Sequence, residues 1–201
     1  MKKKALSVRQ ELILLSLKKH GFLTRDQLGA IHKLGKIRNV NRILSDLSEY
    51  LQSFREGYDT VYYLNSNGKD YTQAKKAMRR TQYAYHTIMR NQFYIYAGQP
   101  KDWKVEIKLG DKKESKVCDA WFQMNGYYHI LEVDNQQKMS ENRNKLKAYS
   151  GMNERGAITK HFGYFPPIIW VTTTELRRKQ LVKMCDEFGL SHQVLTIMDI
   201  K

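Results

Sequence analysis

Three carboxylates within a short stretch of this 201-residue chain have the types and spacing that can bind a hard cation. Asp119 lies inside an apolar-rich run at 116–123, and Glu132 and Asp134 lie near the end of a second run at 127–134. An ionised carboxylate in an apolar segment is costly unless it is paired or bound to a metal ion. Because carboxylate oxygens suit hard cations, the stretch indicates a metal site, with salt bridges to the abundant Lys and Arg as the alternative.

The elements that must bring these carboxylates together are the two strands of a hairpin. Asn125 and Gly126 form a hairpin turn signal between the two apolar runs. Side chains two positions apart in a strand point to the same face, so Glu132 and Asp134 share one face. Asp119 in the partner strand can then converge with them on one cation.

The rest of the second half reads as strands and helices arranged around this hairpin. The expected elements are strand 103–109 with Glu106 in its middle, the hairpin strands, helix 136–150, strand 167–173, helix 175–189 and strand 192–197. A glycine-rich loop is expected at 151–165. This order predicts a mixed sheet with helices packed on it.

Composition and charge indicate a folded protein with a negatively charged partner. With 41% apolar and 11% aromatic residues the chain can build a hydrophobic core. It has no run of about 18 apolar residues that would predict a membrane span. Its basic N-terminus lacks the apolar region of a signal peptide, so we expect a cytoplasmic protein. The net charge of +15 favours a polyanionic partner, with nucleic acid preferred over a membrane surface.

The basic excess lies in the first half, away from the carboxylates. Residues 1–100 hold 18 Lys and Arg against 7 Asp and Glu, whereas residues 101–201 hold 17 against 13. The first half begins with expected helices at 8–20, from Thr24 and at 36–51, followed by a hairpin around 56–57. Three short helices and a hairpin are the order of a winged helix-turn-helix, whose third helix enters the major groove of DNA.

The third expected helix separates an apolar face from a polar face. Its apolar residues follow helical spacing: Val40, Ile43, Leu44, Leu47 and Leu51. The other side carries groups that can reach phosphates and base edges: Arg38, Asn39, Asn41, Arg42 and Ser45. Arg55 lies near the hairpin tip. We therefore expect double-stranded DNA to bind here, against the alternative of a merely solvated face.

A connecting segment is expected between two domains. Residues 66–99 start with SNGKDYT and continue from Gln73 as a long basic and aromatic helix whose aromatic residues are spaced for packing. Its basic cluster faces either phosphate or water, and consists of Lys75, Lys76, Arg79 and Arg80. The expected organisation is a DNA-binding domain at 1–66, a connecting helix at 67–100 and a second domain at 101–201.

The strand and helix order, with acids at the hairpin, resembles the PD-(D/E)xK nuclease-like superfamily. Nearly the whole chain resembles the replication-relaxation family of plasmids, phages and other mobile elements, which joins a winged helix to such a domain. That likeness rests on VYYLNSNGKDY at 61–71, His86, Asn91, Glu106, Asp119, EVDNQQ at 132–137 with its Gln136, Lys145 and Tyr149. The fold class implied is α+β: an N-terminal winged helix-turn-helix followed by an α/β nuclease-like mixed sheet with flanking helices.

The resemblance implies roles for the carboxylates. Glu106, Asp119 and Glu132 would hold Mg²⁺ or Mn²⁺, with Asp134 as a further ligand. Asp134 stands where the superfamily has its catalytic Lys, and a carboxylate cannot supply that positive charge. In some members the Lys comes from the next helix, where Lys145 or Lys138 could serve. The implied catalytic set is therefore Asp119, Glu132, Asp134 and Lys145.

Two functions follow from these residues. The first is a DNA-binding protein of a mobile genetic element, acting in plasmid or phage replication or regulation, on a nuclease-like domain that no longer cuts. The second is an active Mg²⁺- or Mn²⁺-dependent DNA endonuclease or nickase that uses the carboxylates. Replication or regulatory proteins are candidate partners. A homodimer is a candidate assembly, although no sustained heptad predicts a dimer helix.

Overall fold

The computed structural model describes residues 5–75, 79, 81 and 83–201. The chain divides into two compact units, Met1–Asn91 and Gln92–Lys201. The division falls inside the helix α5 (Ala84–Tyr96), so the first part of this helix belongs to one unit and its end to the other. Among the described residues, no helix combines the length and the apolar character needed to cross a membrane.

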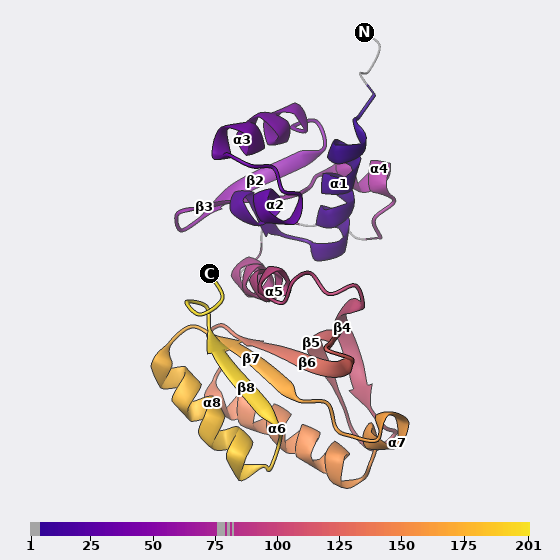
Figure 1. Ribbon diagram of the computed structural model, residues 1–201, viewed down its shortest axis with the longest axis vertical. Helices are drawn as coiled ribbons and strands as arrows, with labels where there is room; N and C mark the ends of the chain where they lie inside the picture. The colour runs from indigo at the N-terminus through magenta and orange to yellow at the C-terminus, as the bar shows by residue number, and fades with distance from the viewer. Residues whose placement is uncertain (1–4, 76–78, 80, 82) are drawn as a thin grey trace. The chain divides into compact units, whose positions relative to one another are not determined.

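The first unit has the element order expected for a winged helix (Figure 1). Its elements are α1 (Val8–His20), β1 (Leu23–Thr24), α2 (Arg25–Ile31), α3 (Ile37–Asp46), β2 (Leu51–Glu56), β3 (Asp59–Leu64) and α4 (Ser66–Thr72). In the described part of this unit the strands pair antiparallel in the order β1-β3-β2. The hairpin of β2 and β3 is called the wing below.

Local sequence signals explain where the first helices begin. Thr24 caps α2 by a reciprocal capping box with Gln27, as predicted, and Ser7 with Gln10 caps α1 in the same way. Each box satisfies backbone N–H groups that a helix N-terminus leaves without partners. The helices then pack their aliphatic side chains into one buried cluster, which includes Ile13, Leu14, Leu17, Leu28, Val40, Ile43 and Leu44.

The expected long helix from Gln73 is too long at its start, and a separate helix that was not expected precedes it. Helix α4 ends at Thr72, and Gln73 follows it in left-handed backbone with φ 54°, a conformation that stops an α-helix. Helix α5 begins only at Ala84. Of the basic cluster predicted between them, Lys76 and Arg80 lie outside the described residues.

The second unit is a mixed sheet with helices packed on it, which confirms the predicted fold class (Figure 1). Its elements are β4 (Trp103–Gly110), β5 (Ser115–Met124), β6 (Tyr127–Asp134), α6 (Met139–Glu154), α7 (Thr159–Phe162), β7 (Ile168–Thr172), α8 (Glu175–Glu187) and β8 (His192–Thr196). The described strands follow the order β4-β5-β6-β7-β8. Strands β4 to β6 pair antiparallel, whereas β7 and β8 join in parallel.

The hairpin turn between β5 and β6 forms as predicted. Asn125 and Gly126 have φ of 51° and 82°, and positive φ at both central positions is what a two-residue hairpin turn of this kind requires. The expected loop at 151–165 differs, because α6 extends to Glu154 and α7 adds one short turn of helix. Helices α6 and α8 pack with the sheet in one core around Leu146, Tyr149, Trp170 and Leu181.

Candidate functional site

The predicted carboxylates lie where β5 and β6 stop pairing. The register of the hairpin ends at Ala120 opposite Leu131, although both strands continue beyond this pair. At the next position the Asp119 side chain takes the place of a backbone acceptor, and the Val133 N–H donates to its Oδ2 at 2.7 Å. The strands therefore diverge into a fork, which is the name used below for the site around Asp119 and Glu132.

Glu132 lies in the fork and is only 1% exposed. Helix α6 supplies two hydrogen-bond donors to it: Lys145 Nζ donates to Oε2, and the Tyr149 hydroxyl donates to Oε1. Lys145 and Tyr149 are four residues apart, so they lie on one face of the helix. The structure thus places Lys145 against the carboxylate, whereas Lys138 is an exposed residue at the start of α6.

Glu132, Lys145 and Tyr149 form a tightly coupled buried group in which all three pKa values are raised. Burial raises the pKa of Glu132 to about 8, with a further rise from Asp119 and an opposing effect of Lys145 and Tyr149. Burial acts to lower the pKa of Lys145, but the carboxylates of Glu132 and Asp119 outweigh it and the pKa is raised. Burial and Glu132 raise the pKa of Tyr149 well above its ordinary value. Lys145 is therefore a cation here and Tyr149 keeps its hydroxyl proton.

Asp134 does not join the fork as a metal ligand, which corrects the expectation for this residue. It is fully buried, and Arg177 Nε and Nη2 each donate to one of its oxygens at 2.6 Å. Asn142 Nδ2 and the Thr172 hydroxyl donate to the same two oxygens at 2.9 and 2.8 Å. Asp134 is thus the centre of a buried ion pair that joins β6 to β7, α6 and α8. The sequence analysis did not identify Arg177 as a partner, because it lies 43 residues from Asp134 along the chain.

Glu106 lies across from Asp119, at the one position where the β4–β5 register is interrupted. Its backbone is left-handed, with φ 54°, and its side chain is exposed. A non-glycine residue in this conformation costs roughly 1–3 kcal/mol, and such residues often mark sites of function. Among the described residues, however, no group of three Asp, Glu, His or Cys side chains could hold a metal ion.

The residues present therefore do not fit the predicted Mg²⁺ or Mn²⁺ site. Glu132 is buried and accepts a hydrogen bond on each carboxylate oxygen, from Lys145 and from Tyr149, so both oxygens are already engaged. Asp134 is engaged by Arg177. Of the other two predicted ligands, Asp119 accepts from the Val133 N–H and Glu106 is exposed. We accordingly derive no reaction step through a metal ion.

Three other residues that the family resemblance marks lie on α5 and between β6 and α6. Asn91 is fully buried in the first unit, where its Nδ2 donates to the carbonyl oxygens of His20 and Phe22 at 3.1 and 2.7 Å. It therefore fastens α5 to the end of α1. His86 is half-buried on α5, and Gln136 is an exposed residue between β6 and α6.

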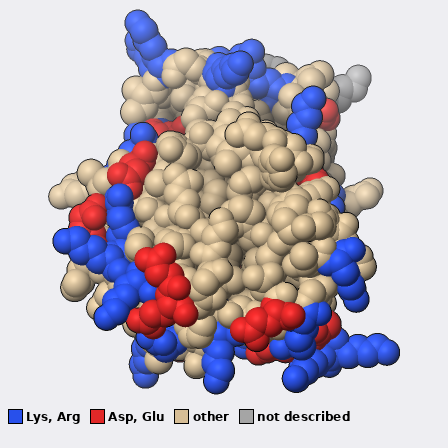
Figure 2. Space-filling view, turned by 60° about the horizontal axis from the view of Figure 1, so that its bottom comes forward, with Lys and Arg blue, Asp and Glu red and all other residues tan. Residues whose placement is uncertain are grey.

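The distribution of charged side chains on the surface bears on the predicted contact with DNA. On the face shown in Figure 2, acidic and basic side chains lie side by side around an uncharged centre. On helix α3 of the first unit, Arg38, Asn41, Arg42 and Ser45 are exposed together with the acid Asp46, while Val40, Ile43 and Leu44 are buried. These exposed groups include four of the five helix residues predicted to contact DNA.

The fifth predicted helix residue, Asn39, is half-buried and has a local role. Its Nδ2 donates to the carbonyl oxygen of Leu34 at 2.8 Å, and its Oδ1 accepts from Arg42 Nη2 at 3.0 Å. Asn39 thus closes the turn before α3 and orients the guanidinium of Arg42. Arg42 also lies 3.6 Å from the Asp46 carboxylate, one turn along the helix.

The wing presents a residue that the sequence analysis did not identify. Tyr58 is 97% exposed beside the turn residue Gly57. Arg55 is exposed on β2, and its Nη1 donates to the Thr60 hydroxyl across the hairpin at 2.9 Å. A cavity of about 250 Å³ lies between α3 and β2, with Asn41, Ser45 and Gln52 among its lining residues. The signal for Tyr58 was its position next to the predicted turn.

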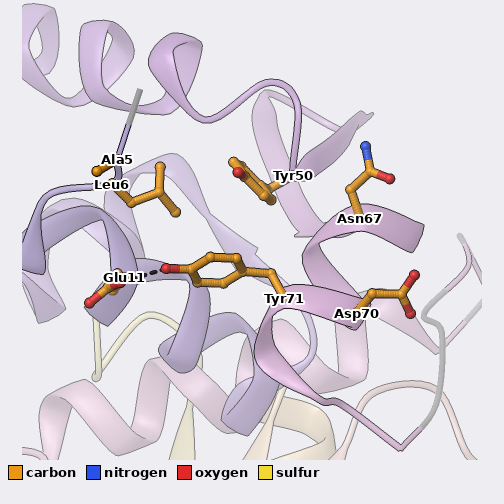
Figure 3. A pocket seen from close by; sticks show the side chains of 7 residues that line it. All are labelled: Ala5, Leu6, Glu11, Tyr50, Asn67, Asp70 and Tyr71. Carbon is orange, nitrogen blue, oxygen red and sulfur yellow. Dashed lines mark hydrogen bonds between the residues drawn. The ribbon is translucent and has the colours of Figure 1, made fainter. Parts of the chain in front are cut away.

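A larger cavity, of about 520 Å³, lies in the first unit between α1 and α4 (Figure 3). The Tyr71 hydroxyl donates to the Glu11 carboxylate inside it, and the Tyr71 ring packs edge-on against Tyr50 at 5.4 Å between centroids. Asn67 and Asp70 point away from this pair in Figure 3. The contacts join α4 to α1, which is a structural role.

The solved structures that match this chain have low sequence identity and low TM-scores. Protein VC1899 from Vibrio cholerae has 14% identity and a TM-score of 0.42, with 98% of this chain and 55% of that chain covered. The restriction endonuclease FokI bound to DNA has 15% identity and a TM-score of 0.35, with 96% and 43% covered. This chain therefore spans about half the length of either protein. No curated protein matches it.

A family model gives the stronger result. The model described as replication-relaxation matches residues 14–168, which include α3, the wing and the fork. The match extends over both compact units and most of the chain. The chain belongs to the replication-relaxation family.

Proposed function

We propose that this protein binds double-stranded DNA through α3 and the wing of its first unit. The observation that carries the proposal is the division of α3 into a buried apolar face and an exposed face of Arg38, Asn41, Arg42 and Ser45. A helix so placed in a winged helix can enter the major groove, where cations contact phosphates and amides contact base edges. The wing, with Arg55 and Tyr58, would lie along the flanking backbone.

The biological setting follows from the family. Replication-relaxation proteins resemble one another in joining a winged helix to a nuclease-like domain, and we assign this chain to replication or regulation of a plasmid, phage or other mobile element. The second unit would then serve as a DNA-associated scaffold that does not cut. The buried pairing of Glu132 and Asp134 with Lys145, Tyr149 and Arg177 supports this assignment.

Duplex affinity and its salt dependence test the proposal. Replacing both arginines in Arg38→Ala/Arg42→Ala is expected to weaken binding to a random-sequence duplex about tenfold and to make the slope of log K against log salt less steep by about 2. Fluorescence anisotropy of labelled duplex over a salt series measures both quantities.

A matched control removes the same charge elsewhere. Lys179 and Lys183 are exposed on α8 of the second unit, so Lys179→Ala/Lys183→Ala changes net charge equally without touching α3. This variant should keep the duplex affinity and the salt slope. If both variants weaken binding equally, the interface is not on α3.

A further inference from the structure

Five aromatic side chains of the second unit form one connected cluster on β5, β6, α7 and the segment after α7. The aromatic cluster consists of Trp121, Tyr127, Tyr128, Phe162 and Tyr164. Phe162 lies at the centre, with ring centroids 5.5 Å from Trp121, 5.1 Å from Tyr128 and 6.3 Å from Tyr164. The Tyr164 ring in turn packs edge-on against Tyr127 at 5.6 Å.

Contacts within the protein hold the cluster in place, and two of its rings remain exposed to solvent. Trp121 is buried and stacks on Tyr128 at 5.1 Å, and the Tyr128 backbone N–H donates to the Tyr164 hydroxyl at 2.7 Å. These contacts fix the rings without covering them all. Tyr127 is 60% exposed and Phe162 is 38% exposed. Connected aromatic rings that remain exposed on a rigid support are uncommon on a surface without a ligand.

Basic residues flank the exposed rings. Lys160 and His161 directly precede Phe162 on α7, and both are exposed. On β4, Lys104 is the cross-strand partner of Trp121 and lies 3.5 Å from the Asp102 carboxylate. That carboxylate also interacts with the Tyr128 hydroxyl. Lys104 is thus already paired, and exposed Lys160 is the cation that complements a negatively charged partner.

We propose that the aromatic cluster binds unpaired nucleotides, with bases stacked on Tyr127 and Phe162 and phosphates near Lys160. Aromatic platforms beside cations are the general means of holding single strands, because every base has a face that can stack. In a duplex those faces are covered by neighbouring base pairs, so the cluster should select unpaired strands. The inference concerns the second unit alone and does not depend on duplex binding by α3.

Removal of the exposed rings tests this proposal. Tyr127→Ala/Phe162→Ala should weaken the binding of labelled oligothymidylate or oligouridylate about tenfold or more, because each stacked base contributes roughly 1–3 kcal/mol. The ring-preserving variant Tyr127→Phe/Phe162→Tyr should retain binding. Tyr96→Ala is the matched control, since Tyr96 is an exposed tyrosine that packs on Phe93, outside the cluster. Anisotropy with single strands and with duplex is measured on the same samples.

Separate outcomes distinguish this surface from the α3 interface. The ring variant should keep duplex affinity, and Arg38→Ala/Arg42→Ala should keep the single-strand affinity of the cluster. Unchanged single-strand binding in the ring variant would overturn the proposal. The proposal would also be overturned if the ring variant kept strand binding but changed its mass in sedimentation, because the rings would then contact a second copy. Should the ring variant not fold, Lys160→Glu with all rings intact must still weaken strand binding.

Discussion

The charged residues predicted for function differ in exposure between the two units. In the first unit, α3 and the wing expose Arg38, Arg42 and Arg55 on a surface whose apolar side is buried. In the second unit, Glu132 and Asp134 are buried and engaged by Lys145 and Arg177. Exposed cations can serve a polyanion, whereas buried ion pairs mainly fix how elements pack. The difference teaches that acids brought together by a hairpin can be held by buried partners from distant helices.

The largest expected effect concerns the pH dependence of Glu132. Because its pKa is about 8 when folded and near 4.5 when unfolded, the folded state binds more protons between these values. The free energy of unfolding should therefore fall as pH rises from about 5 to 8, by at most about 5 kcal/mol from this group. Glu132→Gln should remove this dependence and be the more stable protein at pH 8.

Tryptophan fluorescence can follow this change in the second unit alone, because all 3 tryptophans lie there, at 103, 121 and 170. Urea unfolding of the parent and of Glu132→Gln at pH 5 and pH 8 gives the comparison. Equal pH dependence in both proteins would show that Glu132 titrates as an ordinary carboxyl.

The second effect concerns the Asp134 ion pair. Arg177→Ala leaves a buried carboxylate without its bidentate partner, which typically costs about 3–5 kcal/mol. Tryptophan-monitored urea unfolding should show the loss in the second unit. Lys179→Ala, an exposed substitution on the same helix, provides the control and should change stability by less than about 0.5 kcal/mol. A similarly small loss for Arg177→Ala would show that Asp134 is not held as described.

The third effect appears in the first unit and has the opposite sign. Burial lowers the pKa of His20 to about 4, with smaller contributions from Lys19 and Arg90. The folded unit thus binds fewer protons than the unfolded chain between about pH 6.5 and 4, and its stability should fall by about 3 kcal/mol as pH drops through this range. NMR titration of the His20 ring should show a neutral imidazole at pH 5.5. A midpoint near 6.5 would contradict this.

The smallest effect concerns the wing. Arg55→Ala should weaken duplex binding by severalfold and reduce the salt slope by about 1, since one phosphate contact is lost. Arg55→Lys keeps the charge and should keep the slope. An unchanged slope in Arg55→Ala would confine the interface to α3.

Much of the fold was predictable because its signals are local. The capping box of Thr24, the spacing of Val40, Ile43 and Leu44, and the turn at 125–126 each act within a few residues. Helix α4 and the late start of α5 were not predicted, because SNGKDYT has the composition of a turn and the run from Gln73 that of a helix, whereas Gln73 lies in left-handed backbone.

The candidate site was less predictable, because its partners come from distant positions. The i, i+2 spacing of Glu132 and Asp134 gave their common face but not their partners. Arg177 meets Asp134 only after α8 packs on the sheet, and Lys145 was indicated only by the family resemblance. The aromatic cluster likewise joins β5 and β6 to α7, an element the sequence was expected to leave as loop.

The central claim is that the first unit holds the duplex while the paired carboxylates of the second unit do not cut it. The most direct test incubates supercoiled plasmid with the protein and Mg²⁺, Mn²⁺ or EDTA, and resolves shifted from nicked plasmid on one gel. The parent protein and Glu132→Ala should shift the plasmid equally without nicking, and Arg38→Ala/Arg42→Ala should shift it less. Nicking that requires Mg²⁺ or Mn²⁺ and disappears in Glu132→Ala would contradict the account.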